Sequence, residues 1–200
     1  MGKIFCIAGK SGVGKDTLYH ALVEENIGNL SRVVTFTTRP KRKHETDGVE
    51  YHFVTVEQME QYERSGSIIE RRKYRTVEGD WYYFTLDIDL SGGQNYILIT
   101  TLDVIKVLEQ RYGPESVFVF YLYASDRVRL ERSMNREASQ ANPNYLEICR
   151  RFVADEEDFS FEKIQALLSA EHINTELDIE VNIEQMAEVV FKSTTANLNG

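Results

Sequence analysis

The stretch Gly9-Lys10-Ser11-Gly12-Val13-Gly14-Lys15 fits the pattern GxxxxGK, and it follows a short apolar run at residues 3–8. Residues 17–24 then carry apolar side chains at helical spacing. A strand, a glycine-rich turn and a helix in this order are the context in which the pattern forms a phosphate-binding loop. The glycines let consecutive backbone N–H groups turn toward phosphate oxygens, and Lys15 adds a cation at the outer phosphates. The stretch therefore predicts a site for the triphosphate of ATP.

We assign the whole loop and the start of the helix to this site, with Lys15 also as a catalytic cation. These residues are Gly9, Lys10, Ser11, Gly12, Val13, Gly14, Lys15, Asp16 and Thr17. Asp16 stands where a serine or threonine usually supplies a hydroxyl to Mg²⁺. Because a carboxylate can hold this hard cation directly or through water, we expect Mg²⁺ as a cofactor with Asp16 as its protein ligand.

Outside the loop, β-rich apolar runs alternate with helical patterns. The runs lie at residues 32–36, 96–101 and 117–123, and the helical patterns between and after them at 102–111 and 126–135. This alternation predicts an α/β fold of the P-loop NTPase type, with a parallel sheet flanked by helices and right-handed crossovers.

The chain between residues 35 and 85 is instead rich in Thr, Tyr, Phe and basic residues, which predicts a small β-rich insertion. Asn142-Pro143 resembles a helix start, and we expect a helix from there to about Phe159 and a last one at residues 183–192.

The composition is that of an ordinary globular domain, with 42% hydrophobic and 28% charged residues among 200. A net charge of −9 repels polyanions, so we expect neither nucleic acid nor an anionic membrane as a partner. No run approaches the roughly 18 apolar residues of a membrane span, and we expect a cytoplasmic monomer or homodimer. Cys6 and Cys149 show no metal-ligand spacing and no disulfide framework, and we expect both to be buried thiols.

Beyond the loop, residues 35–54 read TFTTRPKRKHETDGVEYHFV, and residues 82–85 read YYFT. Together with the loop and Ile69-Glu70, these motifs resemble the guanylate kinase family over most of the chain. The second stretch is the most specific, because it is similar to the family pattern TTRxxRxGExxGxxYxF. It matches that pattern at Thr37, Thr38, Arg39, Arg42, Glu45, Gly48, Tyr51 and Phe53.

The resemblance implies that this half of the chain binds a nucleoside monophosphate, with GMP or dGMP as the expected acceptor. The residues implied to bind it are Thr35, Arg39, Arg42, Tyr51, Glu70, Tyr83, Thr85 and Thr101. Arginines can fork onto a phosphate while tyrosine hydroxyls donate to its remaining oxygens. A carboxylate such as Glu70 can accept from the ring N–H and the exocyclic amine of guanine, whereas adenine offers no such ring donor.

The chain departs from the family pattern at several positions. His44 stands where glycine is usual, and Thr101 replaces an acidic residue after the strand at 96–101. Residues 71–80 form an apparent insertion, and Phe84 replaces a glycine beside Tyr83. We expect these changes to alter the acceptor pocket.

Arg132 and Arg136 are four residues apart on a predicted helix, and Arg151 lies on the next one. They resemble the catalytic arginines of the family's lid, although Glu137 replaces a glycine after Arg136. Phosphoryl transfer requires in-line positioning and cations around the transferred group. The resemblance therefore implies catalytic roles for Lys15, Arg39, Arg132, Arg136 and Arg151, in an ATP-dependent transfer that yields a nucleoside diphosphate and ADP. It also implies a lid at 132–159, an acceptor module at 35–85, and a nucleotide-binding core from residues 1–34, 86–131 and 160–200.

Two alternatives remain open. Asp16 and Thr101 are compatible with a kinase for another phosphorylated acceptor, such as ribose bisphosphate. The other alternative is a non-catalytic domain of the same fold that binds proteins in the acceptor groove. Such domains lose the phosphate loop, whereas Gly9, Gly14 and Lys15 are present here.

Overall fold

A computed structural model describes residues 1–42, 45–76, 79–140, 142–167 and 170–195. Its central sheet has five parallel strands in the order β2-β7-β1-β8-β9. The strands are β1 (Ile4–Ala8), β2 (Leu30–Arg32), β7 (Asn95–Ile99), β8 (Val117–Tyr123) and β9 (Glu171–Asn174). The parallel α/β sheet predicted from the sequence is therefore confirmed.

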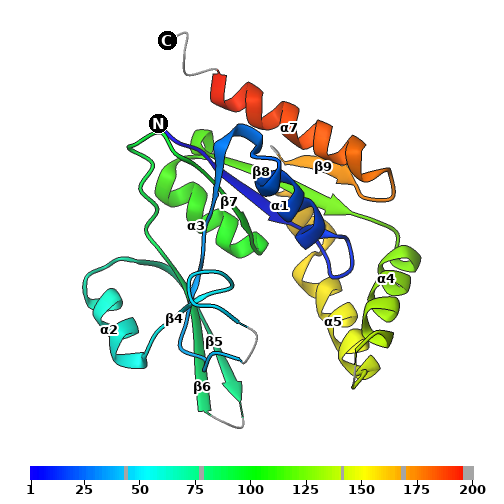
Figure 1. The fold of residues 1–200 in the computed structure, drawn as a ribbon, viewed down its shortest axis with the longest axis horizontal. Coiled ribbons are helices and arrows are strands. Elements are labelled where there is room, and N and C mark those ends of the chain that lie inside the picture. The colour runs from blue at the N-terminus through cyan, green and yellow to red at the C-terminus, as the bar shows by residue number, and fades with distance from the viewer. Residues whose placement is uncertain (43–44, 77–78, 141, 168–169, 196–200) are drawn as a thin grey trace.

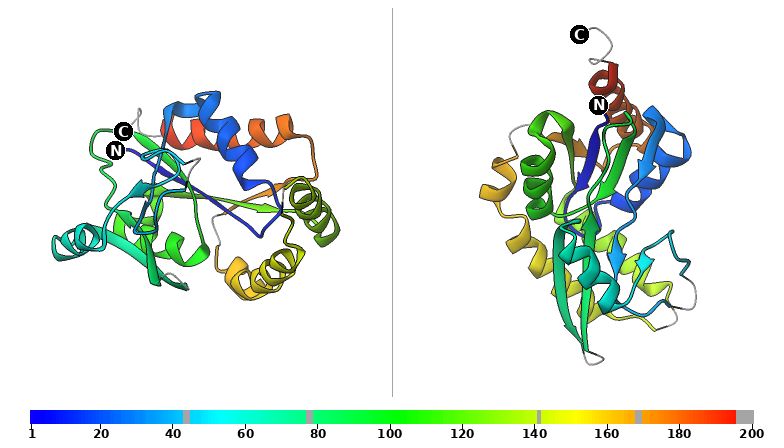
Figure 2. Two further views of the ribbon diagram at one scale, coloured as in Figure 1. Left: turned by 60° about the horizontal axis from the view of Figure 1, so that its bottom comes forward. Right: turned by 90° about the vertical axis from the view of Figure 1, so that its left-hand side faces the viewer.

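Helices cover both faces of this sheet (Figure 2). They are α1 (Lys15–Glu24) and α7 (Ile179–Thr195) on one face and α3 (Leu102–Tyr112) on the other. Every residue of β1 is fully buried. Ile4 and Cys6 pack with the residues of α3, whereas Phe5 and Ile7 pack with those of α1 and α7. A strand buried on both faces reads as a continuous apolar run, which is why residues 3–8 show no alternation.

Residues 35–85, predicted to form the acceptor module and called by that name below, contain a second sheet in the order β4-β3-β6-β5. Its strands are β3 (Phe36–Thr37), β4 (His52–Phe53), β5 (Ile68–Thr76) and β6 (Gly79–Leu86). The apolar run at residues 32–36 therefore does not form one strand, because β2 and β3 belong to different sheets. The module also contains α2 (Val56–Arg64), which was not predicted although Thr55 and Gln58 form a capping box at its start.

The segment predicted as a lid contains α5 (Tyr145–Asp158) and most of α4 (Asp126–Ala138), and α6 (Phe161–Gln165) follows it. We call α4 and α5 the helical arm. The start of α5 was predicted two residues early: its N-cap is Asn144, whose side chain accepts from the Glu147 N–H, and not Asn142. Short 3₁₀ helices lie at Ile27–Asn29 and Pro114–Ser116. The acceptor module and the helical arm extend from the same end of the central sheet (Figure 1).

None of the helices in the described ranges is long and apolar enough to cross a membrane. Of the two cysteines, Cys6 is buried as expected, but Cys149 is exposed on α5, so the prediction that both are buried is wrong for Cys149.

Candidate active site

The phosphate loop connects the end of β1 to the first turn of α1. Gly12 and Gly14 adopt φ angles of 82° and 90°, in the left-handed region that favours glycine. Gly14 is the N-cap of α1, no side chain caps the helix, and a Cβ at Gly14 would find no atom within 4 Å. The N–H groups of the first turn therefore lie beside open space, which fits an anionic phosphate.

Lys15 lies over this loop. Its Nζ donates to the carbonyl oxygens of Gly9 at 2.7 Å and Lys10 at 3.0 Å. Burial lowers the pKa of Lys15, and the carboxylates of Asp155 and Asp16 partly oppose this shift. The amine is thus held where it can reach a phosphate bound in the loop.

Asp16 and Thr17 are both exposed in the first turn of α1. The described part of the chain holds no cluster of three or more His, Cys, Asp or Glu side chains that could bind a metal. Mg²⁺ in nucleotide enzymes is usually bound by one or two protein carboxylates together with substrate phosphates. An exposed carboxylate in the first turn of α1 fits this pattern, and Asp16 has this position.

A buried ion pair that was not predicted joins the loop to the helical arm. Arg129 of α4 is 1% exposed, and its Nη2 donates to Asp155 Oδ2 of α5 at 2.8 Å. The same carboxylate accepts from the Ser11 N–H at 2.7 Å, and Arg129 Nε donates to the Ser11 carbonyl at 3.1 Å. A Cβ at Gly12 would lie 2.5 Å from the Arg129 carbonyl oxygen. The loop, α4 and α5 therefore form one tightly packed unit.

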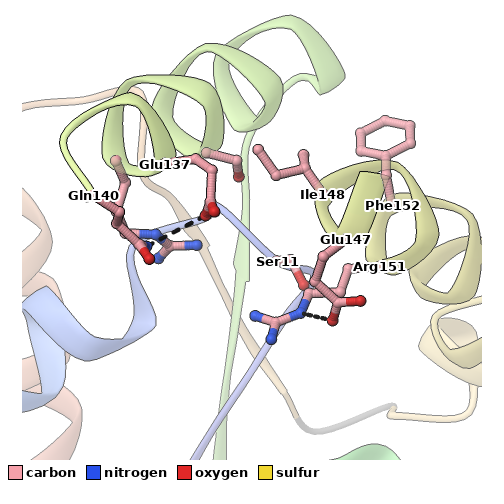
Figure 3. A pocket seen from close by; sticks show the side chains of 9 residues that line it. Ser11, Glu137, Gln140, Glu147, Ile148, Arg151 and Phe152 are labelled. Atoms are coloured by element: carbon pink, nitrogen blue, oxygen red, sulfur yellow. Dashed lines mark hydrogen bonds and ion pairs between the residues drawn. The ribbon is translucent and has the colours of Figure 1, made fainter. Parts of the chain in front are cut away.

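The helical arm encloses a cavity of about 300 Å³ next to the loop (Figure 3). Ser11 lines it on one side, and the predicted catalytic residues Arg136 and Arg151 line it on the arm. Arg151 Nε donates to Glu147 at 2.8 Å, and hydrogen bonds from Arg150 and Arg151 lower the pKa of Glu147 to about 2. Arg136 and Arg151 are both exposed and lie beside the phosphate loop.

Arg132 does not share this cavity. It donates to the Thr175 carbonyl at 2.6 Å and lines a different cavity, of about 380 Å³, beside Gly14 and Thr17. Asn182 of α7 also lines this second cavity. Arg132 and Arg136 are four residues apart on α4, but they line different cavities.

Two cavities lie between the core and the acceptor module, and Thr35, Tyr51 and Ile99 line both. One, of about 540 Å³, is also lined by Tyr83 and residues of the β5–β6 hairpin. The other, of about 460 Å³, reaches Asp16 of the phosphate loop. Burial and the neighbouring Tyr83 raise the pKa of the Tyr51 phenol, so its hydroxyl is a hydrogen-bond donor at neutral pH.

Arg39 and Glu45 form a bidentate pair at the edge of this site. Arg39 is 3% exposed, and its two Nη atoms donate to the two Glu45 oxygens at 2.8 and 2.7 Å. Its remaining bonds go to the Tyr83 hydroxyl, at 3.1 Å, and to the Pro40 carbonyl. The two Nη groups of Arg39, which were predicted to bind an acceptor phosphate, thus bind the Glu45 carboxylate. Arg42 is exposed, and its N–H donates to the same carboxylate.

The Arg39 hydrogen bonds lower the pKa of Glu45 to about 2 from 4.5. A lowered carboxyl pKa stabilises the fold above the unfolded value of 4.5, and this contribution is lost as the pH falls toward about 2. Glu45→Gln should therefore lower the melting temperature at pH 7 by a few degrees. As the pH falls toward about 2, the melting temperatures of the variant and of the wild type should converge. Thermal denaturation followed by circular dichroism tests this. Glu60→Gln, at an exposed position of α2, is the control, and an equal loss for both variants at every pH would contradict the prediction.

Glu70 and Thr85, both predicted to contact the acceptor, lie side by side on β5 and β6. The Thr85 hydroxyl donates to Glu70 Oε1 at 2.8 Å, and the Glu70 side chain is 6% exposed. Arg72 of the hairpin predicted as an insertion lies next to them, with its Nε 3.3 Å from Glu70 Oε2. Thr101, also predicted to contact the acceptor, is exposed and is the N-cap of α3. His44 lies outside the described residues.

Sequence reasoning missed three residues that organise the site: Arg129, Asp155 and Arg72. No local signal marks Arg129 and Asp155, because they are 26 residues apart and meet only through the packing of α4 on α5. Arg72 belongs to a cationic cluster, but the sequence does not show that Arg72 and Arg75 line the cavity of about 540 Å³ whereas Arg71 does not.

A family model described as "Guanylate kinase" matches residues 1–177 of the chain. The chain is 30% identical over 207 residues to a guanylate kinase of Halalkalibacterium halodurans. That alignment covers 94% of this chain and 97% of the relative. It is 28% identical over 192 residues to a guanylate kinase of Oceanobacillus iheyensis, which covers 88% of this chain and 90% of that one.

The fold is similar to the crystal structure of guanylate kinase from Anaplasma phagocytophilum. That similarity has a TM-score of 0.58 at 20% identity and covers 96% of this chain and 86% of the other. The family model, the relatives and the arrangement of the phosphate loop against the acceptor module agree. The chain therefore belongs to the guanylate kinase family.

Proposed function

We propose that the protein transfers the γ-phosphoryl group of ATP to a nucleoside monophosphate, GMP or dGMP, and so forms the diphosphate and ADP. The observation that carries this proposal is the cavity of about 460 Å³ that Asp16 of the phosphate loop shares with Thr35 and Tyr51 of the acceptor module. Donor and acceptor phosphates bound on its two sides would lie close enough to react directly.

In this reaction an oxygen of the acceptor phosphate forms a bond to the γ-phosphorus while the bond to the bridging oxygen of ADP breaks. The chain contributes positioning and positive charge. Lys15 and the N–H groups at the start of α1 bind the donor phosphates, and Arg136 and Arg151 reach the transferred group from the arm. Asp16 would hold Mg²⁺, which neutralises charge on the phosphates. The hydroxyls of Tyr51 and Tyr83 donate hydrogen bonds to the acceptor phosphate, and Arg42 is an exposed cation nearby.

Arg39 has most of its donors engaged by Glu45, Tyr83 and Pro40. We propose that it contributes mainly by placing the Tyr83 hydroxyl and by adding positive potential to the acceptor site. Glu70, Thr85 and Thr35 would read the base. Guanine offers its N1–H and 2-amino group as donors to the buried Glu70 carboxylate, whereas adenine has no donor at N1. The contact of Thr101 with the acceptor stays a prediction, with Thr101 as the exposed N-cap of α3.

A substrate panel tests the proposal. Purified protein with ATP and Mg²⁺ should release ADP in the presence of GMP or dGMP and do so at least about 100-fold less efficiently with AMP. Turnover of a ribose bisphosphate in place of GMP would support the alternative kinase. Absence of ATP binding by equilibrium dialysis would instead support the non-catalytic module.

A further inference from the structure

Arg72 lies on β5 directly opposite Tyr83 of β6 and lines the acceptor cavity of about 540 Å³ together with Tyr51 and Tyr83. Its neighbour Arg71 is bound elsewhere, because its Nη1 donates to Glu63 of α2 at 2.9 Å. Alternation along a strand places successive side chains on opposite faces. The two arginines thus have the same chemistry but different surroundings.

The guanidinium of Arg72 forms an ion pair with Glu70 but no hydrogen bond to any residue that the structure describes. Its Nε is buried and has no hydrogen-bond partner, although it lies 3.3 Å from Glu70 Oε2 as an ion pair. Within the described ranges its other N–H groups make no hydrogen bond, and 39% of the side chain is exposed. A buried donor without a partner is unfavourable. A ligand atom that accepts a hydrogen bond beside Glu70 would remove that cost.

The edge of guanine that a carboxylate reads carries such an atom. Its N1–H and 2-amino groups are donors, and O6 next to them is an acceptor. Glu70 supplies the acceptor for the donors, so O6 requires a donor adjacent to Glu70. Among the described residues, two donor groups interact with the Glu70 carboxylate. The Thr85 hydroxyl donates its hydrogen to Oε1 at 2.8 Å, and the Arg72 guanidinium forms an ion pair with Oε2.

We propose that Arg72 is a specificity-determining residue that donates to O6 of the guanine base while Glu70 accepts from its N1–H and 2-amino groups. This inference rests on the proposed function. An arginine that contacts guanine O6 is the commonest specific contact to this base in nucleic-acid recognition. Adenine would present its 6-amino donor to the Arg72 donors, so the same residue would disfavour AMP.

The test compares wild type, Arg72→Met and the matched control Arg71→Met with GMP, IMP and AMP as acceptors. IMP keeps O6 and N1–H but lacks the 2-amino group. For Arg72→Met we expect kcat/KM to fall about 10- to 100-fold for both GMP and IMP, mainly through KM, with AMP unchanged or improved. Arg71→Met should leave all three values within about twofold of wild type. Arg72→Lys keeps a cation beside Glu70 and should show the same substrate order with a smaller loss.

The outcomes separate this inference from the proposed function. Wild-type protein that does not phosphorylate GMP refutes the proposed function itself. Active wild type with an Arg72→Met variant that is unchanged or faster on GMP overturns only the role of Arg72. An equal loss on GMP, IMP and AMP would show that the substitution damages the site as a whole and would also overturn it. Should Arg72→Met not fold, as judged by circular dichroism, Arg72→Lys decides by the same criteria.

Discussion

Lys15→Ala should reduce kcat for phosphoryl transfer by about 1,000-fold, the largest loss expected for a single side chain of this protein. The Lys15 amine is held at 2.7 Å from the Gly9 carbonyl and 3.0 Å from that of Lys10, so it is positioned before the nucleotide binds. Charge that develops on the transferred group would lose its nearest protein cation. Steady-state ADP release with saturating ATP and GMP measures the effect.

Lys106→Ala removes an exposed lysine of α3 and is the control, for which we expect wild-type kinetics. Because the phosphate-loop N–H groups remain in Lys15→Ala, ATP binding should weaken less than kcat falls. Retention of kcat within about tenfold of wild type would show that another group supplies this charge and would contradict the assigned role.

Asp155→Ala should destabilise the protein by about 3 kcal/mol, which lowers the melting temperature by roughly 6–12 °C for a domain of this size. The variant leaves the guanidinium of Arg129, 1% exposed, without its buried partner and leaves the Ser11 N–H without its acceptor. Arg129 keeps its bond to Asp126 at 2.7 Å, which is why we expect the lower end of the range for a broken buried pair.

Asp155→Asn should lose less than Asp155→Ala, because the amide oxygen can still accept from Ser11 although the charge is gone. Asp158→Ala, at an exposed position one turn later on α5, should stay within about 0.5 kcal/mol of wild type. Urea denaturation of the four proteins measures these differences. Equal stability of Asp155→Ala and Asp158→Ala would show that the ion pair between α4 and α5 does not hold the arm to the phosphate loop.

The sequence predicted most of the central sheet and its helices, because their signals are local. Buried strands such as β1 and β8 appear as uninterrupted apolar runs, and α3 and α4 carry apolar side chains at helical spacing. Helix α2 was missed although Thr55 and Gln58 cap it, since a short polar helix within an aromatic, basic segment has a weak periodic signal.

Roles and contacts in the acceptor site were harder to predict. Arg39 was correctly placed beside Tyr83, but its pairing with Glu45 was not foreseen. A phosphate-binding pattern shows which residues are cations and not which carboxylate they contact. Thr101 was placed with the acceptor by its position in the family pattern. In the structure it is the N-cap of α3, and its contact with the acceptor stays a prediction.

The amino-acid sequence alone was enough to predict the phosphate loop. Its glycines, its lysine and the start of the following helix all lie within seven consecutive residues, 9–15. The tertiary structure alone decided that Asp155 binds Ser11, that Arg132 and Arg136 face different cavities, and that Arg72 rather than Arg71 lies beside Glu70. The physical reason is sequence separation. Local backbone geometry follows from neighbouring residues, but contacts between distant segments depend on how helices and strands pack, and a shift of one residue in register would exchange the faces of Arg71 and Arg72.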